Sequence, residues 1–175
     1  MTITIEIMKV NKDWNRHKDI IAKSYLKKIA DSTLANFKCF ENKKIQISLL
    51  LSDDEQIKQL NAQFRGIDKA TNVLSFPDKQ INYQDIPDIS WSEVIYLGDI
   101  AFSLTTLIAE TKLFGIANIA DYFTHLFIHS ILHLLGYDHE NDIDADIMES
   151  LEIDILQKLN IPNPYINKHY QYNIL

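Results

Sequence analysis

Several features are scarce or missing in this chain of 175 residues, and each absence excludes a class of protein. The single cysteine, Cys39, cannot form an intrachain disulfide, so nothing calls for an oxidising compartment. The longest apolar stretch, residues 126–135, is interrupted by histidines and is too short to span a bilayer. Residues 1–8 alternate in polarity, as a strand does, and lack the basic start and unbroken apolar run of a signal peptide. We therefore expect a soluble, cytoplasmic protein that has no membrane partner.

Positive charge is also scarce. The chain carries 17 Lys and Arg against 24 Asp and Glu, a net charge of -7, and its arginines are Arg16 and Arg65. Affinity for a phosphate backbone comes mostly from Lys and Arg, so this balance argues against a large nucleic-acid footprint. A local basic patch is still compatible with it. We expect no binding to DNA.

The length and a hydrophobic content of 46% fit a single domain over residues 1–175 with a substantial core. Hydrophobic periodicity and turn residues predict strands at 2–7, 45–51, 72–76 and 94–101, and helices at 19–35, 54–64, 104–114, 119–135 and 143–159. No repeat or linker interrupts this order, in which most strands precede most helices. The pattern predicts an α+β fold, with a small mixed sheet of about four strands and helices packed against it.

The last predicted helix carries an apolar stripe at helical spacing. We expect this stripe to pack in the core. Its residues are Ile143, Ile147, Leu151 and Ile155.

Histidines are the clearest functional signal. His129 and His133 are four residues apart on a predicted helix, about 40° apart around its axis, so both rings can reach one point. Gly136 can end the helix and return His139 toward that point. Three imidazoles with a fourth position open to water are typical of a catalytic zinc site, and nickel suits imidazole equally well. We expect His125, on the same helix face, to be a packed and hydrogen-bonded residue.

The same spacing, His-x-x-x-His-x-x-Gly-x-x-His, is also the zinc signature of metzincin proteases. Those enzymes carry a glutamate directly after the first histidine as the general base, where this chain has Ser130. A serine hydroxyl cannot replace a carboxylate as a base near neutral pH. The sequence therefore favours a metal site without peptide hydrolysis.

Residues 129–139, His-Ser-Ile-Leu-His-Leu-Leu-Gly-Tyr-Asp-His, resemble the metal motif of the bacterial YbeY family of single-strand-specific endoribonucleases. Residues 65–77, Arg-Gly-Ile-Asp-Lys-Ala-Thr-Asn-Val-Leu-Ser-Phe-Pro, resemble a second motif of that family. Shorter similarities are found at Leu97-Gly98-Asp99-Ile100, Met148-Glu149 and Asn163-Pro164-Tyr165. The resemblance covers roughly residues 45–165.

This resemblance implies a metal-dependent hydrolase of phosphodiester bonds, with His129, His133 and His139 as ligands of one zinc ion. It implies single-stranded ribosomal RNA as substrate, in maturation of the 16S 3′ end and in ribosome quality control, with the ribosome or ribosomal proteins as partners. Arg65 and His129 are the expected catalytic residues. A guanidinium forks toward phosphate oxygens and stabilises charge at phosphorus. The nucleophile is either a water activated by the metal or the 2′-hydroxyl of the RNA.

Two positions depart from the family pattern, which commonly has glycine at Ser130 and aspartate at Asn72. The first change exchanges one small residue for another, while the second removes a carboxylate beside the expected site. Asp99 or Asp138 could orient a ligating histidine through its free ring nitrogen, or simply cap a turn.

A different class of function stays open. The chain could be a ribosome-associated assembly factor with a structural metal and little nuclease activity of its own. The low positive charge favours this alternative, because a ribosome would supply the positioning that the protein surface lacks.

Overall fold

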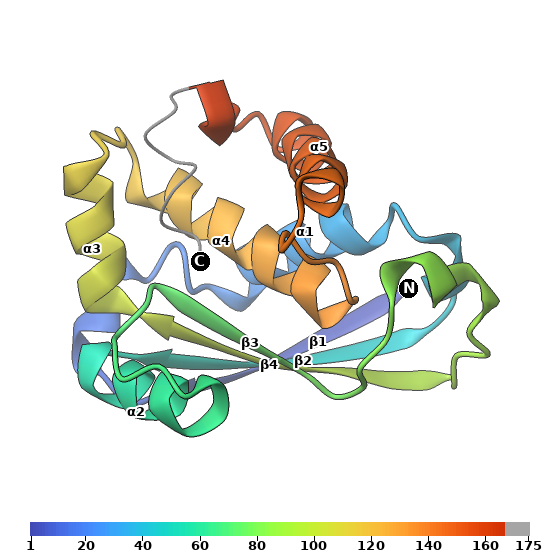
Figure 1. Cartoon of the computed structure of the whole chain (residues 1–175), viewed down its shortest axis with the longest axis horizontal. Coiled ribbons are helices and arrows are strands. Elements are labelled where there is room, and N and C mark those ends of the chain that lie inside the picture. Colours follow the sequence, from blue (N-terminus) through green and yellow to red (C-terminus); the bar gives the residue numbers. More distant parts are fainter. Residues whose placement is uncertain (167–175) are drawn as a thin grey trace.

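The computed structural model describes residues 1–166, so residues 167–175 of the predicted domain lie outside the described part. The α+β class is confirmed (Figure 1). The strands are β1 (Thr2–Lys9), β2 (Lys44–Ser52), β3 (Val73–Pro77) and β4 (Val94–Ser103). The α-helices are α1 (Lys23–Leu34), α2 (Asp54–Arg65), α3 (Leu104–Leu113), α4 (Ile119–Leu134) and α5 (Asp142–Lys158). Short 3-10 helices are η1 (Lys12–His17), η2 (Lys38–Phe40), η3 (Tyr83–Asp88) and η4 (Pro164–Ile166).

The four strands form one mixed sheet, as predicted, and their order in it is β1-β2-β4-β3. β1, β2 and β4 run parallel, and β3 pairs antiparallel with β4 at one edge. Figure 1 shows α1, α4 and α5 on one side of this sheet and α2 on the other. Alternate residues of β2, from Ile45 to Leu51, are buried, because strand side chains point to opposite faces and the helices cover one of these faces.

Helix α4 lies in the centre of the core. Residues 122–132 are buried without exception, and the helix packs against β3, β4, α1, α3 and α5. A helix that is apolar on all sides is stable only when it is covered on all sides. α4 is nevertheless too short to cross a bilayer, and no helix within residues 1–166 is both long and apolar enough to do so.

The prediction that the apolar stripe of α5 packs in the core was wrong for its first two residues. Ile143 is 72% exposed and Ile147 is 40% exposed, whereas Ile155 is buried. The buried face of α5 is shifted around the helix axis, because Glu152 points into the protein and finds hydrogen-bond partners there. That face consists of Met148, Glu152, Ile155 and Leu156.

Glycine is required in the middle of β4. The register of β4 against β2 shifts just before Gly98, whose backbone has a φ of +138°. A Cβ atom there would lie 2.2 Å from the carbonyl oxygen of Phe76 on β3. The β3–β4 pairing at the sheet edge therefore depends on the missing side chain.

We predict that Gly98→Ala lowers the free energy of unfolding by about 3 kcal/mol, because it adds backbone strain and a contact with backbone that cannot move aside. Gly115→Ala is the matched control. Gly115 also has a positive φ but nothing lies within 4 Å of its added Cβ, so its loss should be about 1–2 kcal/mol. Urea denaturation measures both, and equal losses would contradict the proposed close approach.

Candidate metal centre

The end of α4 and the loop after it supply three histidines. His129 and His133 lie on α4, His133 in its last turn, and His139 lies in the loop before α5. Gly136 reverses the chain between them with a φ of +80°, as predicted. A Cβ atom at Gly136 would also lie 2.0 Å from the carbonyl oxygen of Ile81. Glycine is therefore needed both for the turn and for the contact with the segment that follows β3.

The ring nitrogens of these three histidines converge. One ligand atom from each of His129, His133 and His139 lies within 4.8 Å of the others. Zinc lies about 2.0–2.1 Å from its imidazole ligands, so small side-chain movements would bring all three nitrogens to one ion. The predicted convergence is confirmed, and coordination of a metal by these residues stays a prediction.

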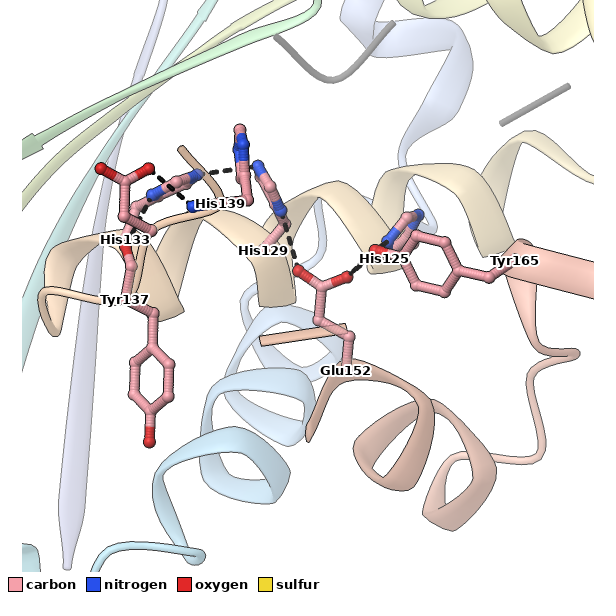
Figure 2. Close-up of polar contacts among 8 residues, drawn as sticks. His125, His129, His133, Tyr137, His139, Glu152 and Tyr165 are labelled. Carbon is pink, nitrogen blue, oxygen red and sulfur yellow. Dashed lines mark hydrogen bonds and ion pairs between the residues drawn. The ribbon is translucent and has the colours of Figure 1, made fainter. Parts of the chain in front are cut away.

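Hydrogen bonds aim two of the rings at each other (Figure 2). Nδ1 of His133 donates to the carbonyl oxygen of Tyr137 at 2.9 Å, and Nδ1 of His129 donates to Oε1 of Glu152 at 2.8 Å. A carbonyl or carboxylate oxygen only accepts, so both protons of the neutral rings are on Nδ1. The lone pairs are then on the two Nε2 atoms, which are 2.9 Å apart. Two lone pairs at this distance repel each other unless a proton or a cation lies between them.

Burial decides against the proton. Desolvation lowers the pKa of His129, and desolvation together with the neighbouring rings of His129 and His139 lowers the pKa of His133 to about 3. Both rings are therefore neutral at pH 7, the form in which imidazole binds metals. Burial by itself would raise the pKa of Glu152, but its contacts with His129 and His125 outweigh burial and lower that pKa. The centre thus combines the neutral rings of His129 and His133 with the carboxylate of Glu152, whose pKa lies below its ordinary value.

Sequence reasoning did not find that carboxylate. Asp138 accepts a hydrogen bond from the backbone of His139 at 2.7 Å, and Asp99 is an exposed residue of β4 opposite Phe76. Within residues 1–166, the carboxylate that binds a ring of the cluster is Glu152. The available signal was weak, because a glutamate in the middle of an acidic helix reads as a solvent-facing residue.

His125 is packed and hydrogen-bonded, as expected. Its ring is 1% exposed, and Nε2 lies 2.9 Å from Oε2 of Glu152. The ring is not part of the converging cluster.

A cleft of about 710 Å³ opens beside the three histidines. It lies between the end of α2, the edge strand β3 with the segment after it, and the end of α4. Arg65, the last residue of α2, is exposed in this cleft and has no hydrogen-bond or ion-pair partner within residues 1–166. Its guanidinium is thus available to an anion in the cleft. Other lining residues are Thr71, Ser75, Lys79, Tyr137 and Asp138.

Comparison with known proteins identifies the family of this chain. The family model described as "Endoribonuclease YbeY" matches residues 9–160, which is most of the chain. The chain belongs to the YbeY family. A curated YbeY endoribonuclease from Rhodopseudomonas palustris (strain BisB5) is 46% identical over 123 residues, which is 70% of this chain and 63% of the relative. The match thus spans less than two thirds of that relative's length.

The fold of this chain is similar to that of a solved structure. The solution structure of a Thermotoga maritima protein superposes with a TM-score of 0.54 at 22% identity, covering 94% of this chain and 96% of the other. At this identity the likeness shows a shared fold only.

The position at which the YbeY family commonly has aspartate is structural in this chain. Asn72 is buried, and its Nδ2 donates to Oε2 of Glu110 at 2.9 Å, while its Oδ1 accepts from the backbone of Val73 at 2.6 Å. A second carboxylate beside Glu110 would repel it, whereas the amide donates to it. Burial raises the pKa of Glu110, against the effect of its hydrogen bonds with Tyr122 and Asn72. Asparagine therefore suits the neighbours that this chain provides.

We predict that about one divalent ion copurifies with each chain, because ring nitrogens of three histidines converge on one point. His129→Ala, His133→Ala and His139→Ala should each lower the metal content measured by elemental analysis, and the triple variant should hold none. His17→Ala is the control, since His17 lies in η1 outside the cluster. Unchanged metal content in the triple variant would show that the ion binds elsewhere.

Proposed function

We propose that this chain is a metal-dependent endoribonuclease that cuts single-stranded RNA. One observation carries the proposal: the convergent nitrogens of His129, His133 and His139 line the same cleft as the unpaired guanidinium of Arg65. Membership of the YbeY family and the name of the Rhodopseudomonas relative support the same activity.

The three histidines would hold the ion, with Nδ1 of His129 and of His133 anchored so that each Nε2 faces the cleft. A divalent ion bound there would supply Lewis acidity toward a phosphoryl oxygen and would activate the nucleophile, either a water molecule or the 2′-hydroxyl of the RNA. Arg65 would bind the phosphate through its planar fork and stabilise the charge that develops at phosphorus. Arg65 and His129 are thus the proposed catalytic residues.

The proposed substrate is ribosomal RNA, at the 3′ end of 16S RNA, in maturation and quality control of the ribosome. A flexible single strand can bend its phosphate onto a recessed site more easily than a duplex can. We propose zinc as the ion, with nickel as an alternative, because imidazole ligands suit both. The whole chain, residues 1–175, would act as one catalytic domain.

A second candidate is a ribosome-associated assembly factor with a structural metal. The charges around the cleft support it, because Arg65 and Lys79 are opposed there by Asp138 and Glu140. With a net charge of -7 the chain has little general attraction for RNA, and a ribosome would have to supply the positioning.

We predict that Arg65→Ala lowers RNA cleavage by about 10²–10³-fold while metal content and melting temperature stay unchanged. The side chain has no partner within the described residues, so its loss should not weaken the fold. Arg65→Lys should restore only part of the activity, because an ammonium lacks the bidentate fork. Arg16→Ala, which changes an arginine of η1 that is outside the cleft, should cleave as the wild type does. Full activity in Arg65→Ala would remove Arg65 from the mechanism.

We further predict that the purified protein cuts labelled single-stranded RNA internally, leaves casein intact, and loses the activity when a chelator is added. Cleavage should weaken as salt rises, but with a shallow slope because few phosphates are contacted. His133→Ala, purified in parallel, controls for contaminating nucleases. Equal cleavage by both proteins would mean that the activity belongs to a contaminant, and no cleavage by either would favour the assembly factor.

A further inference from the structure

Behind the histidine cluster lies a buried polar network that joins three elements (Figure 2). Glu152 of α5 is fully buried, with its Oε1 on Nδ1 of His129 and its Oε2 on Nε2 of His125, both from α4. The hydroxyl of Tyr165, in η4, also donates to Oε2 of Glu152. The network thus connects the segment after α5 to a ring of the candidate metal centre.

A buried carboxylate at this position lowers the stability of the fold unless its interactions compensate for the loss of water. Removing an ionised group from water costs several kcal/mol, and apolar residues of similar volume often replace a buried charge without loss of stability. Here the carboxylate is compensated by donors from His129, His125 and Tyr165, and none of these carries a permanent positive charge. The packing of α5 on α4 does not require such an arrangement, whereas the orientation of His129 does.

We propose that Glu152 is the positioning residue of the metal centre. Tyr165, from the segment after α5, then determines how firmly Glu152 holds the ring of His129. This inference rests on the proposed function, because it assumes that His129 binds a metal. A carboxylate that accepts the Nδ1 proton of a ligating histidine fixes the ring and makes its other nitrogen more basic.

The two carboxylate oxygens of Glu152 bind different partners. Oε1 binds His129, and Oε2 is held by His125 and Tyr165, so the second pair of contacts fixes the rotation of the carboxylate. Nδ1 of His125 has no hydrogen-bond partner within residues 1–166, so Nε2 provides the hydrogen bonds that hold this ring. The ring of Tyr165 packs edge-on against His125 at a centroid distance of 5.4 Å. Loss of the Tyr165 hydroxyl would therefore loosen Glu152 directly and His125 with it.

The first test is Glu152→Gln, which keeps the shape and removes the charge. Zn²⁺ affinity, measured by competition with a chromophoric chelator in the absence of RNA, should fall about 10- to 100-fold. The Co²⁺ absorption spectrum should also change, because a neutral amide oxygen accepts the Nδ1 proton of His129 more weakly than a carboxylate does and leaves its Nε2 less basic. A purely structural role would lower the melting temperature of the metal-free protein but leave both metal readouts unchanged.

The second test keeps the inference falsifiable if Glu152→Gln does not fold. Tyr165→Phe removes one hydroxyl and should weaken Zn²⁺ binding by about threefold to tenfold. Tyr25→Phe is the matched control, since its hydroxyl also bonds to α4, at 2.7 Å from Oγ1 of Thr124, but does not touch the network. This control should bind Zn²⁺ as tightly as the wild type does.

His133→Ala, measured beside these variants, separates the two possible failures. Wild-type affinity in Glu152→Gln and Tyr165→Phe would overturn the positioning role while the metal site stands. The same loss in Tyr25→Phe as in Tyr165→Phe would also overturn it, because any weakening of α4 would then suffice. Wild-type protein that binds Zn²⁺ no better than His133→Ala would remove the metal site of the proposed function, and this inference with it.

Discussion

The burial of α4 on every side is the constraint on which the rest of this structure depends. The helix fills the space between the sheet and the helices α1, α3 and α5, and it has no solvent-facing stripe from residue 122 to residue 132. Close packing leaves such a helix few ways to shift or rotate. Two of the three histidines are therefore carried by a helix whose position is fixed by close packing, and His129 is placed by the core itself.

Three of the buried polar residues of α4 find partners within the protein, whereas Oγ of Ser130 has none within residues 1–166. His125 and His129 bind Glu152, and Thr124 binds the hydroxyl of Tyr25. Burial of unpaired polar groups would cost stability, so these contacts decide which faces of α1 and α5 meet α4. Helix α5 turns Glu152 inward and leaves Ile143 in solvent, which is the reverse of what hydrophobicity alone favours.

The edge strand β3 brings the other wall of the cleft to the histidines. Antiparallel pairing with β4 directs the segment after β3 past the end of α4, where the carbonyl of Ile81 lies against Gly136. The turn that precedes β3 begins at Gly66, which ends α2 and leaves Arg65 exposed in the cleft. Two glycines, Gly98 and Gly136, permit these close approaches, because any side chain there would meet backbone. Residues 65–81 and 129–139 thus face each other although they are far apart in sequence.

The sequence by itself determined the elements and the histidine cluster, because both depend on short-range periodicity. The spacing of His129 and His133 and the turn at Gly136 follow from helix geometry, which is the same in every protein. Only the tertiary structure decided that Glu152 lies behind His129, that Tyr165 closes the network, and that Asn72 serves Glu110. Each of these contacts joins residues from different elements, and the pairing depends on which helix faces meet. Local periodicity predicts the buried face of a helix from its apolar residues. It fails in α5, where Glu152 is buried and two residues of the apolar stripe are exposed.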